Sequence, residues 1–172
     1  ADAISVVLAN PDGQPIHFRP GMFYTVVVNL DGREYRRAYS LSSAAHHGDQ
    51  AMITVKRVSG GLVSNWLNDQ LKAGDTLRVL GPSGNFTVTP DDAMARNLLL
   101  VAGGSGITPL MSITRTLLEC EPLTRIHLFY GNRGLDDIIF RDALCMLEQE
   151  YDERLSVIHV LENPPEAWQG EA

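Results

Sequence analysis

The chain has 172 residues, 44% of them hydrophobic, which suffices for one large domain or two small ones with hydrophobic cores. Its formal net charge of −7 argues against nucleic acid or an anionic membrane as a partner, because both are bound through basic surfaces. No segment reads as a signal peptide or as an apolar run long enough to cross a bilayer, so we expect a cytoplasmic protein.

The first half of the chain is built from short strand-like runs separated by turn signals such as Asp31-Gly32 and Gly74-Asp75. Apolar residues at helical spacing over 62–71 add one helix. This pattern predicts a small antiparallel barrel. The expected strands cover residues 4–8, 22–29, 34–40, 51–58 and 76–80.

After the polar stretch 89–92, the pattern changes to strands that alternate with helices. Such alternation is typical of a parallel sheet with helices on its faces. The sequence therefore predicts two domains, at residues 1–90 and 91–172. In the second domain we expect strands at 97–102, 125–131 and 155–161 and helices at 107–120 and 136–151.

The segment RAYSLSS at residues 37–43 alternates three chemistries along an expected strand. Arg37 and Tyr39 lie on one face of such a strand, and Ser40 points the other way. A guanidinium can grip a diphosphate, a phenol ring can cover a planar heterocycle, and a hydroxyl can bond a ring atom. These are three needs of a bound flavin, although an ordinary surface strand with a half-buried tyrosine has the same pattern.

Gly60 and Gly61 stand between the strand at 51–58 and the helix that follows. Free backbone N–H groups at a helix start attract phosphate, and glycine lets the backbone approach it closely. Ser64 can add a hydroxyl in the first turn. A plain strand–turn–helix has the same outline.

The segment GGSGITP at residues 103–109 joins the first strand and first helix of the second half. In βαβ units, nucleotide phosphates meet a helix N-terminus at this position. Pro109 replaces the third glycine of a full G-x-G-x-x-G and is tolerated in the first helical turn. Thr108 can cap the helix or touch the ligand.

Two charged residues bear on the choice of coenzyme. Arg133 follows the second strand of this half, where an arginine accommodates a 2′-phosphate and an acid reads a 2′-hydroxyl. Glu162 follows the third strand. Arg133 can also be an ordinary exposed charge.

In this order, the motifs resemble the ferredoxin–NADP⁺ reductase family, with its R-x-Y-S-x-x-S/T, G-G-x-x-S and G-G-x-G-I-T-P segments. The chain is most similar to the bacterial oxygenase reductases and to the reductase module of flavohaemoglobins. The resemblance implies an antiparallel six-stranded Greek-key flavin barrel followed by a partial Rossmann-like parallel α/β domain that binds NAD(P)H.

The resemblance also implies residue roles. Arg37 would hold the flavin phosphates, Tyr39 would stack on the ring system, and Ser40 would bond near the flavin N5 atom. Thr108 would lie beside the nicotinamide, so Ser40 and Thr108 are the candidate catalytic residues. The other candidate cofactor-binding residues are Lys56, Gly60, Gly61, Ser64, Gly103, Gly104, Gly106, Asn132 and Arg133. Where NADPH-specific members of the family tend to place Ser-Arg, this chain has Glu162, which would repel a 2′-phosphate, so NADH and NADPH both stay open.

By this resemblance we expect an FAD-dependent NAD(P)H reductase that passes single electrons to an iron–sulfur or haem acceptor such as an oxygenase. FAD is favoured over FMN because the phosphate site at the helix start suits a diphosphate. The alternatives are a flavin-binding electron-transfer subunit and a flavin-binding module without turnover.

Relative to the family, we expect a truncated chain that lacks the first barrel strand and the C-terminal strands, which would leave a hydrophobic sheet edge exposed. An iron–sulfur (2Fe–2S) centre would then sit in a missing domain or in a partner protein.

The remaining distinctive residues are assigned no ligand. Cys120 and Cys145 are expected to be small buried apolar residues, without a disulfide or a metal site. The pair His46-His47 is expected at a hairpin tip without a metal. The segment GPSGNF at 81–86 is interpreted as a turn, with Phe86 as a packing residue.

Overall fold

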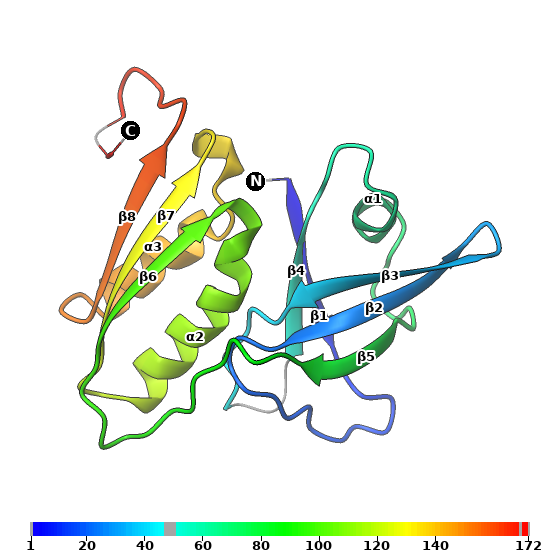
Figure 1. The fold of residues 1–172 in the computed structure, drawn as a ribbon, viewed down its shortest axis with the longest axis horizontal. Helices are drawn as coiled ribbons and strands as arrows, with labels where there is room; N and C mark the ends of the chain where they lie inside the picture. The colour runs from blue at the N-terminus through cyan, green and yellow to red at the C-terminus, as the bar shows by residue number, and fades with distance from the viewer. Residues whose placement is uncertain (1, 47–50, 169, 172) are drawn as a thin grey trace.

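The computed structural model describes residues 2–46, 51–168 and 170–171, which form two parts joined in sequence (Figure 1). The N-terminal part contains antiparallel strands and one helix. The C-terminal part contains a parallel sheet covered by two helices. This arrangement confirms the expected barrel followed by a Rossmann-like α/β domain.

The N-terminal part consists of two antiparallel sheets, with strand orders β1-β4 and β3-β2-β5. The hairpin between β2 and β3 turns at Asp31 and Gly32, which both have positive φ, as a type I′ hairpin turn requires. An isolated bridge from Leu41 to Ile53 links the end of β3 to the other sheet. The elements are β1 (Ala3–Leu8), β2 (Phe23–Leu30), β3 (Arg33–Ser40), β4 (Ala51–Lys56), α1 (Leu62–Asp69) and β5 (Arg78–Ser83).

The C-terminal part has three parallel strands in the order β6-β7-β8. Alternate residues of β7 (Ile126, Leu128 and Tyr130) are buried in one cluster with residues of α2 and α3. Both helices therefore cover the same face of the sheet. The elements are β6 (Asn97–Gly103), η1 (Gly104–Gly106), α2 (Ile107–Cys120), β7 (Arg125–Asn132), η2 (Leu135–Asp137), α3 (Arg141–Glu150) and β8 (Leu155–Leu161).

The sequence predicts helices on the faces of the sheet, and in the structure both helices lie on the same face. Two successive right-handed crossovers, each moving to the next strand on the same side, place both helices on one face. The opposite face leaves two apolar side chains of β6 in water, with Leu99 66% exposed and Val101 71% exposed. These two side chains lie on a face of the sheet, and the exposed hydrophobic edge expected from the sequence stays a prediction.

Several local expectations also need correction. The segment at 81–86 is only partly a turn, since strand β5 continues through Gly81 and Pro82. Pro is tolerated there because β5 is an edge strand. Phe86 is 64% exposed, so it is no packing residue here. Cys145 is exposed because α3 turns only Leu144 fully inward, and Cys120 is half-buried.

The expected helix at 136–151 begins later. Asp136 and Asp137 lie in the short turn η2, and α3 starts at Arg141 after Phe140, whose φ of 63° cannot continue a helix. Within the described residues, no helix is both long and apolar enough to span a membrane.

Candidate functional site

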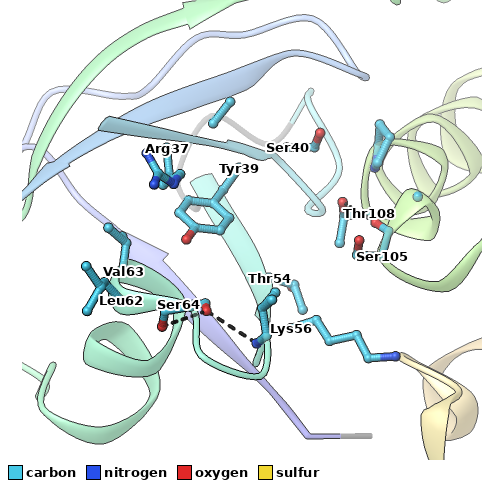
Figure 2. Close-up of a pocket in the computed structure, with 15 residues that line it drawn as sticks. Arg37, Tyr39, Ser40, Thr54, Lys56, Leu62, Val63, Ser64, Ser105 and Thr108 are labelled. Atoms are coloured by element: carbon cyan, nitrogen blue, oxygen red, sulfur yellow. Dashed lines mark hydrogen bonds between the residues drawn. The ribbon is translucent and has the colours of Figure 1, made fainter. Parts of the chain in front are cut away.

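The three sequence motifs meet at one cleft between the two parts of the molecule (Figure 2). One wall comes from β3, β4 and the start of α1, and the other comes from η1 and the start of α2. The cavity has a volume of about 470 Å³, which is in the range of small-molecule sites. It is lined by Arg37, Ala38, Tyr39, Ser40, Thr54, Lys56, Val58, Gly61, Leu62, Val63, Ser64, Ser105, Gly106, Thr108 and Pro109.

Strand β3 supplies an available cation and a half-buried aromatic ring. Figure 2 shows Arg37 and Tyr39 on the same side of the strand, with Ser40 toward Thr108. Arg37 Nη1 donates to the carbonyl of Arg36 at 2.7 Å, and no carboxylate of a described residue is within ion-pair distance of Arg37. Burial raises the pKa of Tyr39, so its phenol is neutral at pH 7. Because Arg37 has no carboxylate partner among the described residues, its guanidinium charge is available to bind an anion.

The start of α1 places backbone donors at the cleft. No side chain caps this helix, so its first N–H groups have no side-chain acceptor. Ser64 Oγ accepts from the Val58 N–H and donates to the Gly61 carbonyl, both at 3.3 Å; these bonds are the dashed lines in Figure 2. A Cβ at Gly61 would lie 2.5 Å from Ser64 Oγ, and Gly60 has a φ of +69°. This turn therefore requires both glycines.

An ion-pair network joins the cleft to the end of β7. Asp137 Oδ1 lies 2.8 Å from Lys56 Nζ of the barrel and 2.9 Å from Arg133 Nη2. Hydrogen bonds from Lys56 and then from Arg133 lower the pKa of Asp137 to about 2. The sequence did not single out Asp137, and its only signal was its place four residues after Arg133.

The glycine-rich turn before α2 forms the opposite wall. Gly104 has a φ of +49°, which favours glycine, whereas Gly106 has an ordinary helical conformation. Thr108 Oγ1 donates to the Ser105 carbonyl at 2.9 Å, so its hydroxyl bonds back to η1 and does not cap the helix, which has no side-chain cap. Ser105 also lines the cleft and was missed as a site residue, although it lies inside the GGSGITP motif.

The side chain of Tyr130 holds this turn in place. Its buried hydroxyl donates to the Gly104 carbonyl at 2.9 Å and accepts from the Ile139 N–H at 3.2 Å. Burial raises the pKa of Tyr130 to about 12, which keeps the donating proton in place at neutral pH. The phenol thereby ties the glycine turn to the segment before α3.

The residues proposed to read the ribose lie at the adjoining ends of β7 and β8. Asn132 is buried, and its side-chain amide has no hydrogen-bond partner among the described residues. Arg133 is 73% exposed. The Glu162 N–H donates to the Asn132 carbonyl at 3.0 Å, which brings the two strand ends together. Asn132 does not line the cavity, and neither do four other candidate residues: Gly60, Gly103, Gly104 and Arg133.

His46 Nε2 lies 2.7 Å from Glu119 Oε2, and His47 lies outside the described residues. Over the part of the chain that the structure describes, no group of three or more His, Cys, Asp or Glu side chains is arranged to hold a metal.

Two family models together match most of the chain. The model for the oxidoreductase FAD-binding domain matches residues 2–88, and the model for the oxidoreductase NAD-binding domain matches residues 100–172. The chain belongs to this family of FAD- and NAD-binding oxidoreductases. The predicted resemblance to oxygenase reductases and flavohaemoglobin modules is thereby confirmed, with FAD and NAD as the cofactor classes of these domains.

Curated relatives are reductase components. The ferredoxin reductase component of 3-ketosteroid-9-alpha-monooxygenase from Rhodococcus rhodochrous is 39% identical over 166 residues, covering 95% of this chain and 46% of the relative. The glycine betaine monooxygenase reductase subunit of Pseudomonas aeruginosa is 38% identical over 160 residues, covering 91% and 43%. The chain thus spans about half the length of the curated relatives it matches.

Solved structures show the same fold. The Amycolatopsis cytochrome P450 reductase GcoB has a TM-score of 0.85 at 32% identity, covering 99% of this chain and 50% of that one. The flavohaem-like FAD/NAD-binding domain of nitric oxide dioxygenase from Vibrio cholerae O1 has a TM-score of 0.84 at 27% identity, covering 100% and 74%.

Proposed function

We propose that this chain forms the catalytic core of an FAD-dependent reductase that takes a hydride from NADH or NADPH and delivers single electrons to a protein acceptor. The observation that carries the proposal is the convergence of the motifs: Arg37, Tyr39 and the α1 start face the η1–α2 turn across one cleft. A bound flavin accepts the electron pair of a hydride and can release the electrons one at a time.

The residues of the barrel wall fit a flavin diphosphate. Arg37 has no competing carboxylate among the described residues, so it would hold the phosphates with the uncapped N–H groups of α1. Tyr39 would cover one face of the ring system, and Ser40 would bond its reactive edge. Ser64 and Lys56 would complete this wall, with Lys56 oriented by Asp137.

The α/β wall fits a dinucleotide. The turn at 103–106 would approach the pyrophosphate, Thr108 would lie beside the nicotinamide, and Asn132 and Arg133 would contact the adenosine side. We also propose that residues 1–90 and 91–172 are the flavin-binding and nicotinamide-binding domains. The acceptor would be an iron–sulfur or haem protein or domain, since the relatives are reductase components of monooxygenases.

A visible spectrum of the purified protein, recorded before and after anaerobic addition of NADH or NADPH, tests this function. We expect flavin absorption that bleaches with at least one nucleotide. Protein reconstituted with FAD that binds no flavin would refute the proposal. Flavin that neither nucleotide bleaches would indicate an electron-transfer subunit or a module without turnover.

A further inference from the structure

Helix α2 carries a line of three buried hydroxyl groups on one face. Thr108, Ser112 and Thr116 are spaced four residues apart, so they lie above one another along the helix. Thr108 stands at the cleft, and the other two extend away from it along the boundary between the two parts of the molecule. In Figure 1, α2 lies between the parallel sheet and the barrel.

The two inner hydroxyls bind the barrel directly. Ser112 Oγ donates to the Ser43 carbonyl at 2.7 Å. Thr116 Oγ1 accepts from the Ala45 N–H at 2.9 Å and donates to the Ser112 carbonyl at 2.7 Å. The bonds to Ser43 and Ala45 join residues 69 and 71 positions apart in the sequence, so they attach the nicotinamide-binding half to the backbone that follows β3.

That backbone segment is itself held firmly by β4. The Ser42 N–H donates to the Met52 carbonyl at 2.7 Å, and the Met52 N–H donates to Ser43 Oγ at 3.0 Å. Ser42 Oγ and Thr54 Oγ1 share a buried hydrogen bond of 2.8 Å. A shift of α2 against the barrel would therefore have to break the bonds of Ser112 and Thr116.

We propose that Ser112 and Thr116 are positioning residues that set the distance between the nicotinamide and flavin sites. The proposal rests on the function proposed above. Ser43 lies three residues after Ser40, and Ser112 lies one helical turn after Thr108, so their bond connects the two walls next to the candidate catalytic residues. Apolar contacts allow two surfaces to slide, whereas hydrogen bonds are directional. Transfer between bound groups is steeply sensitive to such a displacement.

The same helix offers a matched control. Thr114 is also fully buried, but its hydroxyl has no hydrogen-bond partner among the described residues. Thr114→Val and Thr116→Val make the same chemical change two residues apart, and only the second removes a bond to the barrel. Thr116→Ser keeps the hydroxyl and is the conservative rescue.

The experiment measures flavin content, the nucleotide dissociation constant and the limiting rate of flavin reduction by anaerobic stopped flow, using the preferred nucleotide. For Ser112→Ala and Thr116→Val, we expect normal flavin content, dissociation constants within about twofold, and limiting rates lowered about tenfold or more. Thr114→Val and Thr116→Ser should stay within about twofold of wild type in all three measurements.

Amide hydrogen exchange in the flavin-free protein gives a second readout. The Ala45 amide should exchange faster in Thr116→Val and at the wild-type rate in Thr114→Val. Wild-type protein that neither nucleotide reduces would refute the proposed function. If wild type is reduced normally and Ser112→Ala and Thr116→Val reduce as fast as Thr114→Val, the positioning role is overturned.

Discussion

Replacing Asp137 with Asn should weaken the connection between the two halves of the molecule. Its single Oδ1 atom lies 2.8 Å from Lys56 Nζ and 2.9 Å from Arg133 Nη2, so one carboxylate holds a cation from each half. Lys56 and Arg133 lower the pKa of Asp137 from 3.8 to about 2. That change corresponds to at most about 2.4 kcal/mol of folding free energy. The side chain is 25% exposed, so solvent screening reduces the expected effect to about 1 kcal/mol.

The sign of the pH dependence follows from the direction of this pKa shift. A carboxyl with a lower pKa in the folded state stabilises the fold above its unfolded pKa of 3.8 and loses this contribution as the pH falls toward about 2. The stability difference between wild type and Asp137→Asn should therefore be largest near pH 7. It should shrink between about pH 5 and pH 2.

Urea unfolding of wild type and Asp137→Asn at several pH values measures this difference. Asp136→Asn is the control, because Asp136 lies in the same turn, is exposed and forms no ion pair with a described residue. The reasoning is refuted if Asp137→Asn matches wild type at pH 7, or if its deficit persists undiminished at pH 3. An equal loss in Asp136→Asn would show that the turn, and not the ion pairs, is responsible.

Three further predictions concern the cleft. Arg37→Ala should lower FAD affinity about tenfold or more, measured by flavin fluorescence titration, because a charge-assisted contact to the diphosphate disappears. Gly104→Ala and Gly106→Ala should slow flavin reduction by NAD(P)H at normal flavin content, and only Gly104→Ala should also lower the melting temperature, because its φ is +49°. If Arg133 binds a 2′-phosphate, Arg133→Ala should slow flavin reduction by NADPH more than reduction by NADH. If Glu162 decides the choice instead, NADH should reduce the wild-type flavin faster than NADPH, and Glu162→Arg should restore reduction by NADPH.

Specific outcomes would contradict these three expectations. An Arg37→Ala protein that keeps its flavin through dilution and gel filtration would remove Arg37 from the phosphate site. Loss of flavin with unchanged reduction kinetics in the Gly106→Ala protein would show that the two sites are interchanged. A constant NADPH/NADH ratio across the Arg133 and Glu162 variants would place ribose discrimination elsewhere.

Patterns within one element predicted the fold well. The bounds of α2 and β8 agree with the sequence prediction, because their apolar spacing is regular and their ends are marked by turns. The start of α3 was misplaced because Phe140 adopts a left-handed backbone conformation, which the spacing of apolar residues does not predict. Phe86 was misjudged for a related reason, since hydrophobicity alone does not tell whether a connecting segment turns a side chain inward.

The candidate site was predictable where a motif is continuous in the chain, as at RAYSLSS and GGSGITP. Contacts between distant residues were not. Lys56 and Asp137 are separated by 81 positions, and their ion pair arises only when the two halves meet. The same holds for Ser112 and Thr116, which in the sequence look like ordinary polar positions of an amphipathic helix.

The uncovered face of the parallel sheet has a consequence for work with this chain in isolation. Parallel sheets are usually covered on both faces, but here Leu99 and Val101 project into water from β6, which is also an edge strand. Its outer N–H and C=O groups can pair with a strand of another molecule, and the two apolar side chains would add adhesion. Preparations of these 172 residues alone should thus become turbid or oligomeric as protein concentration rises, and a charged side chain at position 99 or 101 should delay that association.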